Sequence, residues 1–189
     1  PAGFAPFNVM DLGGSIYVTY AVQDPDKHDD VAGAGNGIVD KYDLNGNLVG
    51  RLVTGGALDS PWGLALAPVG LSGLGGDLLV GNFGDGSINA YDPNTGALVE
   101  TLTDANGNPL AIDGLWGLAF GNGGNAGPTS TLYFTAGPGG ESHGLFGELN
   151  AVPEPGTWLL TGLSLLGICV YSRSFAAKNF FVSRRNSSN

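Results

Sequence analysis

The 189-residue chain has one cysteine and few positive charges. The lone Cys169 excludes an internal disulfide and a cysteine-rich metal site, and its apolar surroundings favour a buried, unreactive thiol. Residues 1–150 contain 16 Asp and Glu but only 3 Lys and Arg, so they would repel a phosphate backbone. We therefore expect no nucleic-acid partner. The chain starts at Pro1 without a basic and apolar leader, from which we expect the C-terminal part of a longer protein.

Glycine and apolar residues are plentiful instead. The chain has 34 glycines, 42% hydrophobic residues and only 13% charged residues. This balance is typical of many tight turns between buried strands, and the regular apolar runs argue against disorder. We expect an all-β protein.

The clearest pattern lies in residues 60–104, which predict four short strands at 61–66, 77–83, 87–91 and 97–102. Two turns join the later strands, Gly84-Asp85-Gly86 and the Asp-Pro-Asn-Thr-Gly sequence at 92–96. Gly, Asn and Asp adopt the positive φ that such hairpin turns require. Four antiparallel strands with two apolar faces predict one propeller blade.

The blade pattern repeats along the chain. Leu115–Phe120 restates Pro61–Leu66 at a shift of 54, and strands at 131–135 and 144–149 follow it. An earlier copy begins at 6–10, continues at 15–20 and 37–42, and its segment 42–49 matches 91–99. The pattern predicts about 2.75 four-stranded blades, the third lacking its outer strand. Since fewer than about four blades do not close a ring, we expect part of a larger, six-bladed β-propeller, with an open fan of three blades as the alternative.

Propeller geometry places the loops between second and third strands on one face, together with the loops that enter each first strand. Both histidines fall there, His28 in an acidic loop and His143 beside Glu141. We expect no cofactor, but carboxylates on this face could hold a divalent metal such as Ca²⁺. The candidate ligands are Asp24, Asp26, Asp29, Asp59 and Asp113. Their alternative roles are turn residues that accept backbone hydrogen bonds and a solvated acidic loop.

The sequence predicts no catalytic residue. No Ser-His-Asp grouping is recognisable, and no cysteine lies in residues 1–150. Trp62 and Trp116 are interpreted as core residues that fill the gap between neighbouring blades rather than as a platform for sugars.

Residues 151–189 form a second unit with a different composition. Val152, Pro153, Glu154 and Pro155 break regular structure, and an uncharged run follows them before Arg173. This run predicts a short transmembrane helix near residues 157–172, with aromatic residues at its ends and a basic side that stays cytoplasmic. The alternative is a buried core helix. The anchoring residues are Trp158, Leu159, Leu160, Leu163, Leu165, Leu166, Ile168, Val170, Tyr171 and Arg173.

The order of Val152-Pro153-Glu154-Pro155, apolar span and basic end resembles the PEP-CTERM sorting signal of exopolysaccharide-producing Gram-negative bacteria. The resemblance covers residues 152–185. It implies export, transient anchoring in the inner membrane, recognition by an exosortase and cleavage near residues 153–155, with release to the cell surface or extracellular matrix.

Residues 60–65, 79–86 and 115–118 are similar to an exported NHL/TolB-like β-propeller family, which implies a propeller fold but no activity. We therefore expect an exported binding or structural protein of the cell surface or biofilm matrix, with an unknown ligand there. The alternative is a metal-dependent hydrolase of the gluconolactonase or strictosidine-synthase type, for which only Asp59 and Asp113 could serve as inner-strand ligands.

Overall fold

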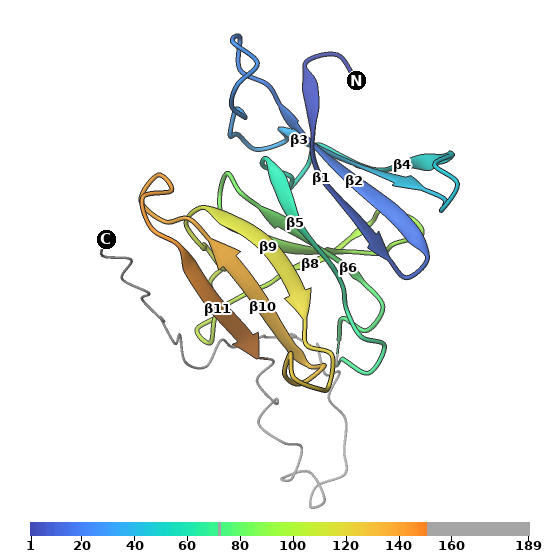
Figure 1. Cartoon of the computed structure of the whole chain (residues 1–189), viewed down its shortest axis with the longest axis vertical. Helices are drawn as coiled ribbons and strands as arrows, with labels where there is room; N and C mark the ends of the chain where they lie inside the picture. The colour runs from blue at the N-terminus through green and yellow to red at the C-terminus, as the bar shows by residue number, and fades with distance from the viewer. Residues whose placement is uncertain (72, 151–189) are drawn as a thin grey trace, which may run out of the picture.

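The computed structural model describes residues 1–71 and 73–150, which form eleven strands in three antiparallel sheets (Figure 1). The first sheet contains β1 (Phe4–Leu12), β2 (Ser15–Val22), β3 (Gly37–Tyr42) and β4 (Leu48–Thr54). The second contains β5 (Pro61–Leu66), β6 (Leu78–Asn82), β7 (Ile88–Tyr91) and β8 (Leu98–Thr101). The third contains β9 (Leu115–Phe120), β10 (Thr131–Ala136) and β11 (Leu145–Asn150).

Each sheet is a meander in which every strand pairs with the next one along the chain. The all-β class and the sheets of four, four and three strands are thereby confirmed. The arrangement is consistent with consecutive blades of a partial propeller. The predicted transmembrane helix near 157–172 lies outside the described residues, and within 1–71 and 73–150 no helix is long and apolar enough to span a membrane.

Two apolar cores fill the spaces between consecutive sheets. Alternate side chains of β6 point to opposite faces, so Leu78 and Val80 join the core toward the first sheet while Leu79 joins the core toward the third. The third sheet contributes Phe134, which is 1% exposed, to the second of these cores. A sheet that is apolar on both faces can be stabilised only between two neighbours, as the blade pattern predicts.

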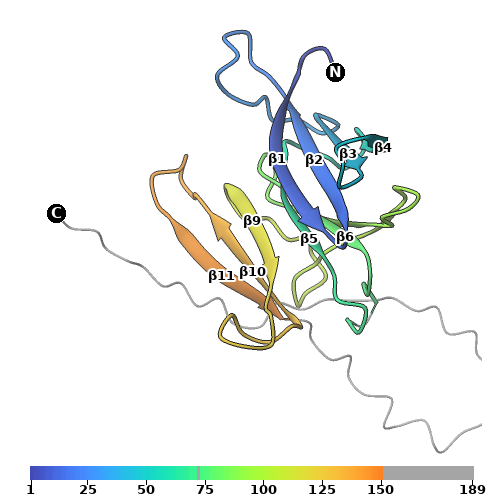
Figure 2. The same ribbon diagram turned by 45° about the vertical axis from the view of Figure 1, so that its right-hand side comes forward.

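The first strands of the three sheets lie next to one another, with β5 between β1 and β9 in both views (Figures 1 and 2). Their backbones come close because Gly63 has no side chain. A Cβ there would lie 2.8 Å from the Leu118 Cγ and 2.8 Å from the Trp116 carbonyl oxygen. The Asn8 side-chain amide also donates to the Trp62 carbonyl at 2.8 Å. These three inner strands form the wall from which the candidate site is built.

Candidate ligand-binding cleft

Each inner strand carries one extra residue near its start. In the first sheet Pro6 pairs with Tyr20 and Asn8 with Thr19, which leaves Phe7 with no residue opposite it. In the second sheet the pairing skips from Pro61 to Gly63. The residue omitted there is Trp62, the counterpart of Phe7 in the repeat.

The third sheet repeats this irregularity. Leu115 pairs with Ala136 and Leu118 with Phe134, so Trp116 and Gly117 face the single residue Thr135. The Gly117 N–H donates to the Thr135 hydroxyl at 3.0 Å. A β-bulge redirects the side chains at its extra residue, out of the alternation of the strand. Three bulges at one repeat position therefore aim three aromatic side chains toward the same region.

The aromatic rings meet at steep angles. The Phe7 and Trp62 ring centroids are 4.6 Å apart with an interplanar angle of 75°. Phe83, which directly follows β6, adds a further ring 6.2 Å from Phe7 at 81°. Such edge-to-face contacts are favourable for aromatic pairs, so the rings support one another as well as lining the site.

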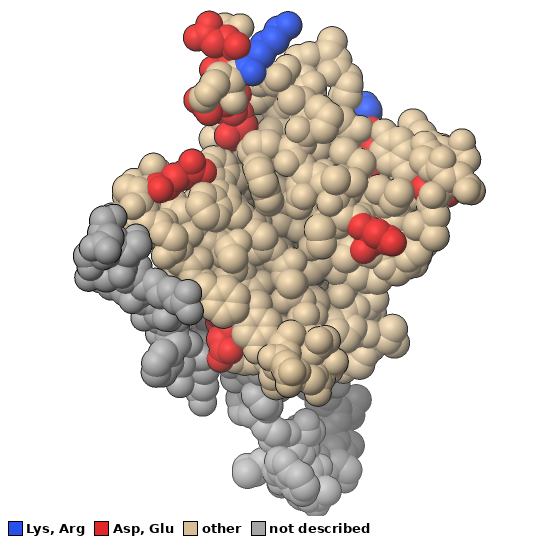
Figure 3. All heavy atoms as spheres, in the orientation of Figure 1, with Lys and Arg blue, Asp and Glu red and all other residues tan. Residues whose placement is uncertain are grey.

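These residues and two loops enclose a cleft of about 620 Å³. Four aromatic residues line it, Phe7, Trp62, Phe83 and Trp116. The β2–β3 loop contributes His28, Asp29 and Asp30, and the β10–β11 loop contributes Glu141. Acidic atoms gather over these two loops in Figure 3. The prediction that loops between second and third strands share one face is thus confirmed for the first and third sheets.

Two polar contacts involve the titratable residues that line the cleft. The His28 Nδ1 lies 3.1 Å from the Asp29 Oδ1, and this hydrogen bond raises the pKa of the exposed imidazole. The Trp116 indole N–H donates to the Glu141 Oε1 at 3.2 Å, which orients the indole relative to the carboxylate. Glu141 has a positive φ of 62°, an uncommon backbone conformation for a residue other than glycine.

Three of the predicted metal ligands accept hydrogen bonds from backbone N–H groups. The Asp59 carboxylate accepts the Gly33 N–H at 2.7 Å, and Asp113 accepts the Gly139 N–H at 2.8 Å. Asp24 accepts the His28 N–H at 2.8 Å. The alternative interpretation of Asp59 and Asp113, as residues that accept backbone hydrogen bonds, is confirmed. They fasten the loops that form the cleft.

Asp59 is the least exposed of these carboxylates, at 8%. Burial raises its pKa, partly offset by the hydrogen bond from Gly33. Of the other candidates, Asp26 is exposed on the β2–β3 loop and Asp29 lines the cleft. Within residues 1–71 and 73–150, no group of three or more His, Cys, Asp or Glu side chains is placed to hold a metal ion.

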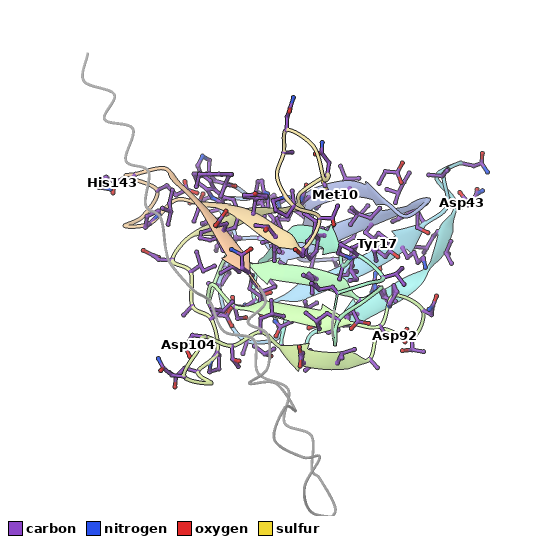
Figure 4. All side chains as sticks on the ribbon, turned by 90° about the horizontal axis from the view of Figure 1, so that it is seen from below. Met10, Tyr17, Asp43, Asp92, Asp104 and His143 are labelled. Carbon is purple, nitrogen blue, oxygen red and sulfur yellow. The ribbon has the colours of Figure 1, made fainter. Side chains whose placement is uncertain are left out.

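The two histidines do not form a pair in the cleft. His28 lines it, whereas the His143 Nδ1 lies 2.7 Å from the hydroxyl of its neighbour Ser142. Figure 4 shows His143 near the tip of the β10–β11 loop, at the outer edge of the molecule. A joint role for both imidazoles at one ligand has no geometric basis.

The interpretation of Trp62 and Trp116 as core residues is wrong, although Trp62 packs against Phe7 of the neighbouring sheet. Both side chains are half-buried and line the cleft, while other residues of the same sheets, mostly aliphatic but including Tyr91 and Phe134, fill the cores. The physical reason is the bulge, which removes these positions from the strand's alternation. Sequence reasoning also missed Phe7 and Phe83. For Trp62 and Trp116 the available signal was the glycine that follows each of them, since glycine inside a strand often marks a β-bulge.

No protein-family model matches the chain. Three uncharacterised proteins of Acanthamoeba polyphaga mimivirus are similar to it, with identities of 41% over 120 residues, 35% over 150 and 34% over 119. These alignments cover 63%, 79% and 62% of the chain but 30%, 39% and 22% of the relatives. The chain thus spans well under half the length of the relatives it matches.

Among solved structures, hydrazine synthase of Kuenenia stuttgartiensis is similar to the chain, with a TM-score of 0.47 and 14% sequence identity. The match covers 77% of this chain and 32% of that one.

Proposed function

We propose that the protein is a binding protein that captures a ligand of the cell surface or extracellular matrix in the aromatic cleft. The observation that carries this proposal is the placement of Phe7, Trp62 and Trp116 at three equivalent bulges, all facing one concavity. Ligand sites are concave, mostly apolar and fitted with a few polar groups, and this cleft has all three properties. The sheets act as a scaffold and the loops supply the polar rim.

The proposal includes the wider architecture. We place the three sheets within a larger, six-bladed propeller of the NHL/TolB-like kind. The support is the repeat of about 54 residues and the order β1, β5, β9 of neighbouring inner strands, in which each sheet adds one strand to a common inner wall.

The proposal also includes sorting by the tail, and its support is the sequence alone. The motif at residues 152–155, the apolar run and the basic end resemble a PEP-CTERM signal, which would direct the protein through an exosortase to the surface of a Gram-negative bacterium. Changing Pro153, Glu154 and Pro155 to alanine should leave an uncut form in the membrane fraction. Identical maturation of this variant and the wild type would remove the sorting proposal.

Intrinsic fluorescence tests the binding proposal directly. Two of the three tryptophans, Trp62 and Trp116, line the cleft, so Trp158→Phe gives a full chain in which all indole emission arises there. We expect solute fractions of the extracellular matrix to change this emission, and Phe7→Ala to abolish the change. Phe146→Ala is the control, because Phe146 is 54% exposed, stacks on Tyr133 and does not line the cleft. Loss of the response in both variants, or in neither, would contradict the proposal.

A further inference from the structure

We propose that the ligand of the cleft is a small organic cation, a quaternary ammonium compound whose methylated nitrogen sits among the aromatic rings. This inference rests on the proposed binding function and specifies its ligand class. It is carried by three independent properties of the cleft: the angles between its rings, the charge of its rim and its size.

The angles between the rings suit a methylated ammonium group better than a sugar. A flat sugar stacks on the broad face of one exposed ring, whereas a methylated ammonium is surrounded by several rings set at angles to one another. Phe7 makes angles of 75° with Trp62 and 81° with Phe83, and both contacts are edge-to-face. Trp116, from the third sheet, adds another wall. The arrangement therefore presents ring surfaces in several directions, which suits a compact cation.

Carboxylates predominate in the charge of the lining, where the His28 imidazole, 3.1 Å from Asp29, is the group that becomes positive on protonation. Asp29, Asp30 and Glu141 supply three carboxylates, and none of the described residues that line the cleft is Lys or Arg. Lys27 belongs to the same acidic loop but is exposed and does not line the cleft. A cation over aromatic faces is attracted by the ring quadrupoles, and nearby carboxylates add to that attraction. An anionic ligand would meet repulsion from all three carboxylates.

Glu141 connects the acidic residues of the cleft with its aromatic residues. Its Oε1 accepts the Trp116 indole N–H at 3.2 Å, so the carboxylate that faces the cleft also fixes one of the aromatic walls. Glutamine at this position would retain an oxygen acceptor for the indole and lose the charge. The chain thereby offers a substitution that separates the charge from the ring position.

The volume indicates a small molecule. About 620 Å³ lies within the roughly 300–1,000 Å³ of typical small-molecule sites, and it exceeds what a trimethylammonium group alone would fill. The ligand therefore carries a further substituent beside its cationic nitrogen. We accordingly choose two probes, choline and the bulkier benzyltrimethylammonium ion.

The experiment titrates the full chain carrying Trp158→Phe with each probe, followed by cleft fluorescence and by calorimetry. The matched control ligand is the neutral carbon isostere of choline, in which tert-butyl replaces trimethylammonium. We expect both cations to bind and the isostere to bind at least about tenfold more weakly, because it lacks the cation–π attraction. Equal binding of choline and its neutral isostere would overturn the inference.

Two variants of equal net charge test the rim. Asp29→Asn, Asp30→Asn and Glu141→Gln together remove the three carboxylates of the cleft. Asp11→Asn, Asp43→Asn and Asp92→Asn remove three carboxylates at the opposite ends of the strands, Asp11 in the last residues of β1 and the other two directly after β3 and β7. We expect the first variant to bind choline about tenfold more weakly and the second to bind like wild type. If both variants bound choline equally weakly, overall charge rather than the carboxylates of the cleft would explain the effect, and the assigned site would be overturned.

A neutral oligosaccharide distinguishes this inference from the proposed function. Binding of the sugar without binding of either cation would leave a binding protein but refute its cationic ligand. If neither cation binds while matrix solutes still change the cleft fluorescence, the inference again fails and the proposed function stands. Far-UV circular dichroism and urea unfolding of every variant confirm that the fold is retained.

Discussion

Two buried asparagines predict a measurable coupling in the second sheet. The Nδ2 atoms of Asn82 and Asn89 both donate to the carbonyl oxygen of Ala57, at 2.8 and 3.0 Å. Both asparagines are at most 1% exposed, and Ala57 lies in the loop that leads into β5 and the cleft. Either single alanine substitution leaves this carbonyl with one donor. Only the double substitution removes both.

The single substitutions have different expected costs. Asn82→Ala loses its bond to Ala57 and one of 3.1 Å to the Ser87 hydroxyl, but it also removes a buried Oδ1 that has no hydrogen-bond partner among the described residues. We expect a loss of about 1 kcal/mol in the free energy of unfolding. Asn89→Ala also loses the 2.6 Å bond from the Thr101 hydroxyl, so about 3 kcal/mol is expected.

The double variant should lose more than the sum of the two. Ala57 is half-buried, and its carbonyl without a donor should cost about 1 kcal/mol, a cost that appears only when both amides are gone. The Ser87 hydroxyl, 3.1 and 3.3 Å from the same two amides, loses both contacts at the same time and adds to this coupling. The assay is urea unfolding of the full chain in a double-mutant cycle, with the slope checked for two-state behaviour. Each 1 kcal/mol should also lower Tm by about 2–4 °C for a chain of this size. Additivity within about 0.5 kcal/mol would refute the shared role of the Ala57 carbonyl.

Three further predictions concern packing and pH. Gly63→Ala should lower the free energy of unfolding by about 1–3 kcal/mol, since its Cβ would lie 2.8 Å from atoms of β9, whereas Gly50→Ala, with nothing within 4 Å, is the control in urea unfolding. Asp59→Asn should keep the hydrogen bond from Gly33 without a buried charge. Because burial raises the Asp59 pKa, wild-type stability falls as pH rises through that pKa, so the variant's advantage in urea midpoint should be larger at about pH 7 than at about pH 4. Choline affinity should fall as pH decreases through the raised pKa of His28, whose positive charge opposes a cation, and His28→Gln should flatten this dependence in calorimetric titrations from about pH 8 to 5.

The sheets were predictable from sequence because their signals are local. Short alternating apolar runs and turns rich in Gly, Asn and Asp mark strands without reference to the rest of the chain. The turn at Asp92 shows why: its carboxylate accepts the backbone N–H groups of Asn94 and Thr95, which fixes the turn and lowers the Asp92 pKa. The same contact would form in almost any fold that contained this sequence.

The cleft was only partly predictable because it depends on register. The sequence placed His28 and Glu141 on one face, since strand direction alone decides which loops share a face. It did not show where Trp62 or Trp116 would point. Their direction follows from one unpaired residue in each inner strand, and alternation read from sequence assumes a regular ladder. Phe7 stayed unnoticed for the same reason.

The bulges also explain how one repeat serves both packing and binding. A regular inner strand would direct each aromatic ring into the space between two sheets, where Leu64 and Leu118 already pack. One extra residue per strand turns Phe7, Trp62 and Trp116 out of that space while the aliphatic residues after them resume the core pattern. Because the core and the cleft use different residues of the same strands, ring substitutions in the cleft should affect binding far more than unfolding. Three sheets that stack by repeating one pattern consequently assemble a single cleft, to which each sheet contributes an aromatic wall.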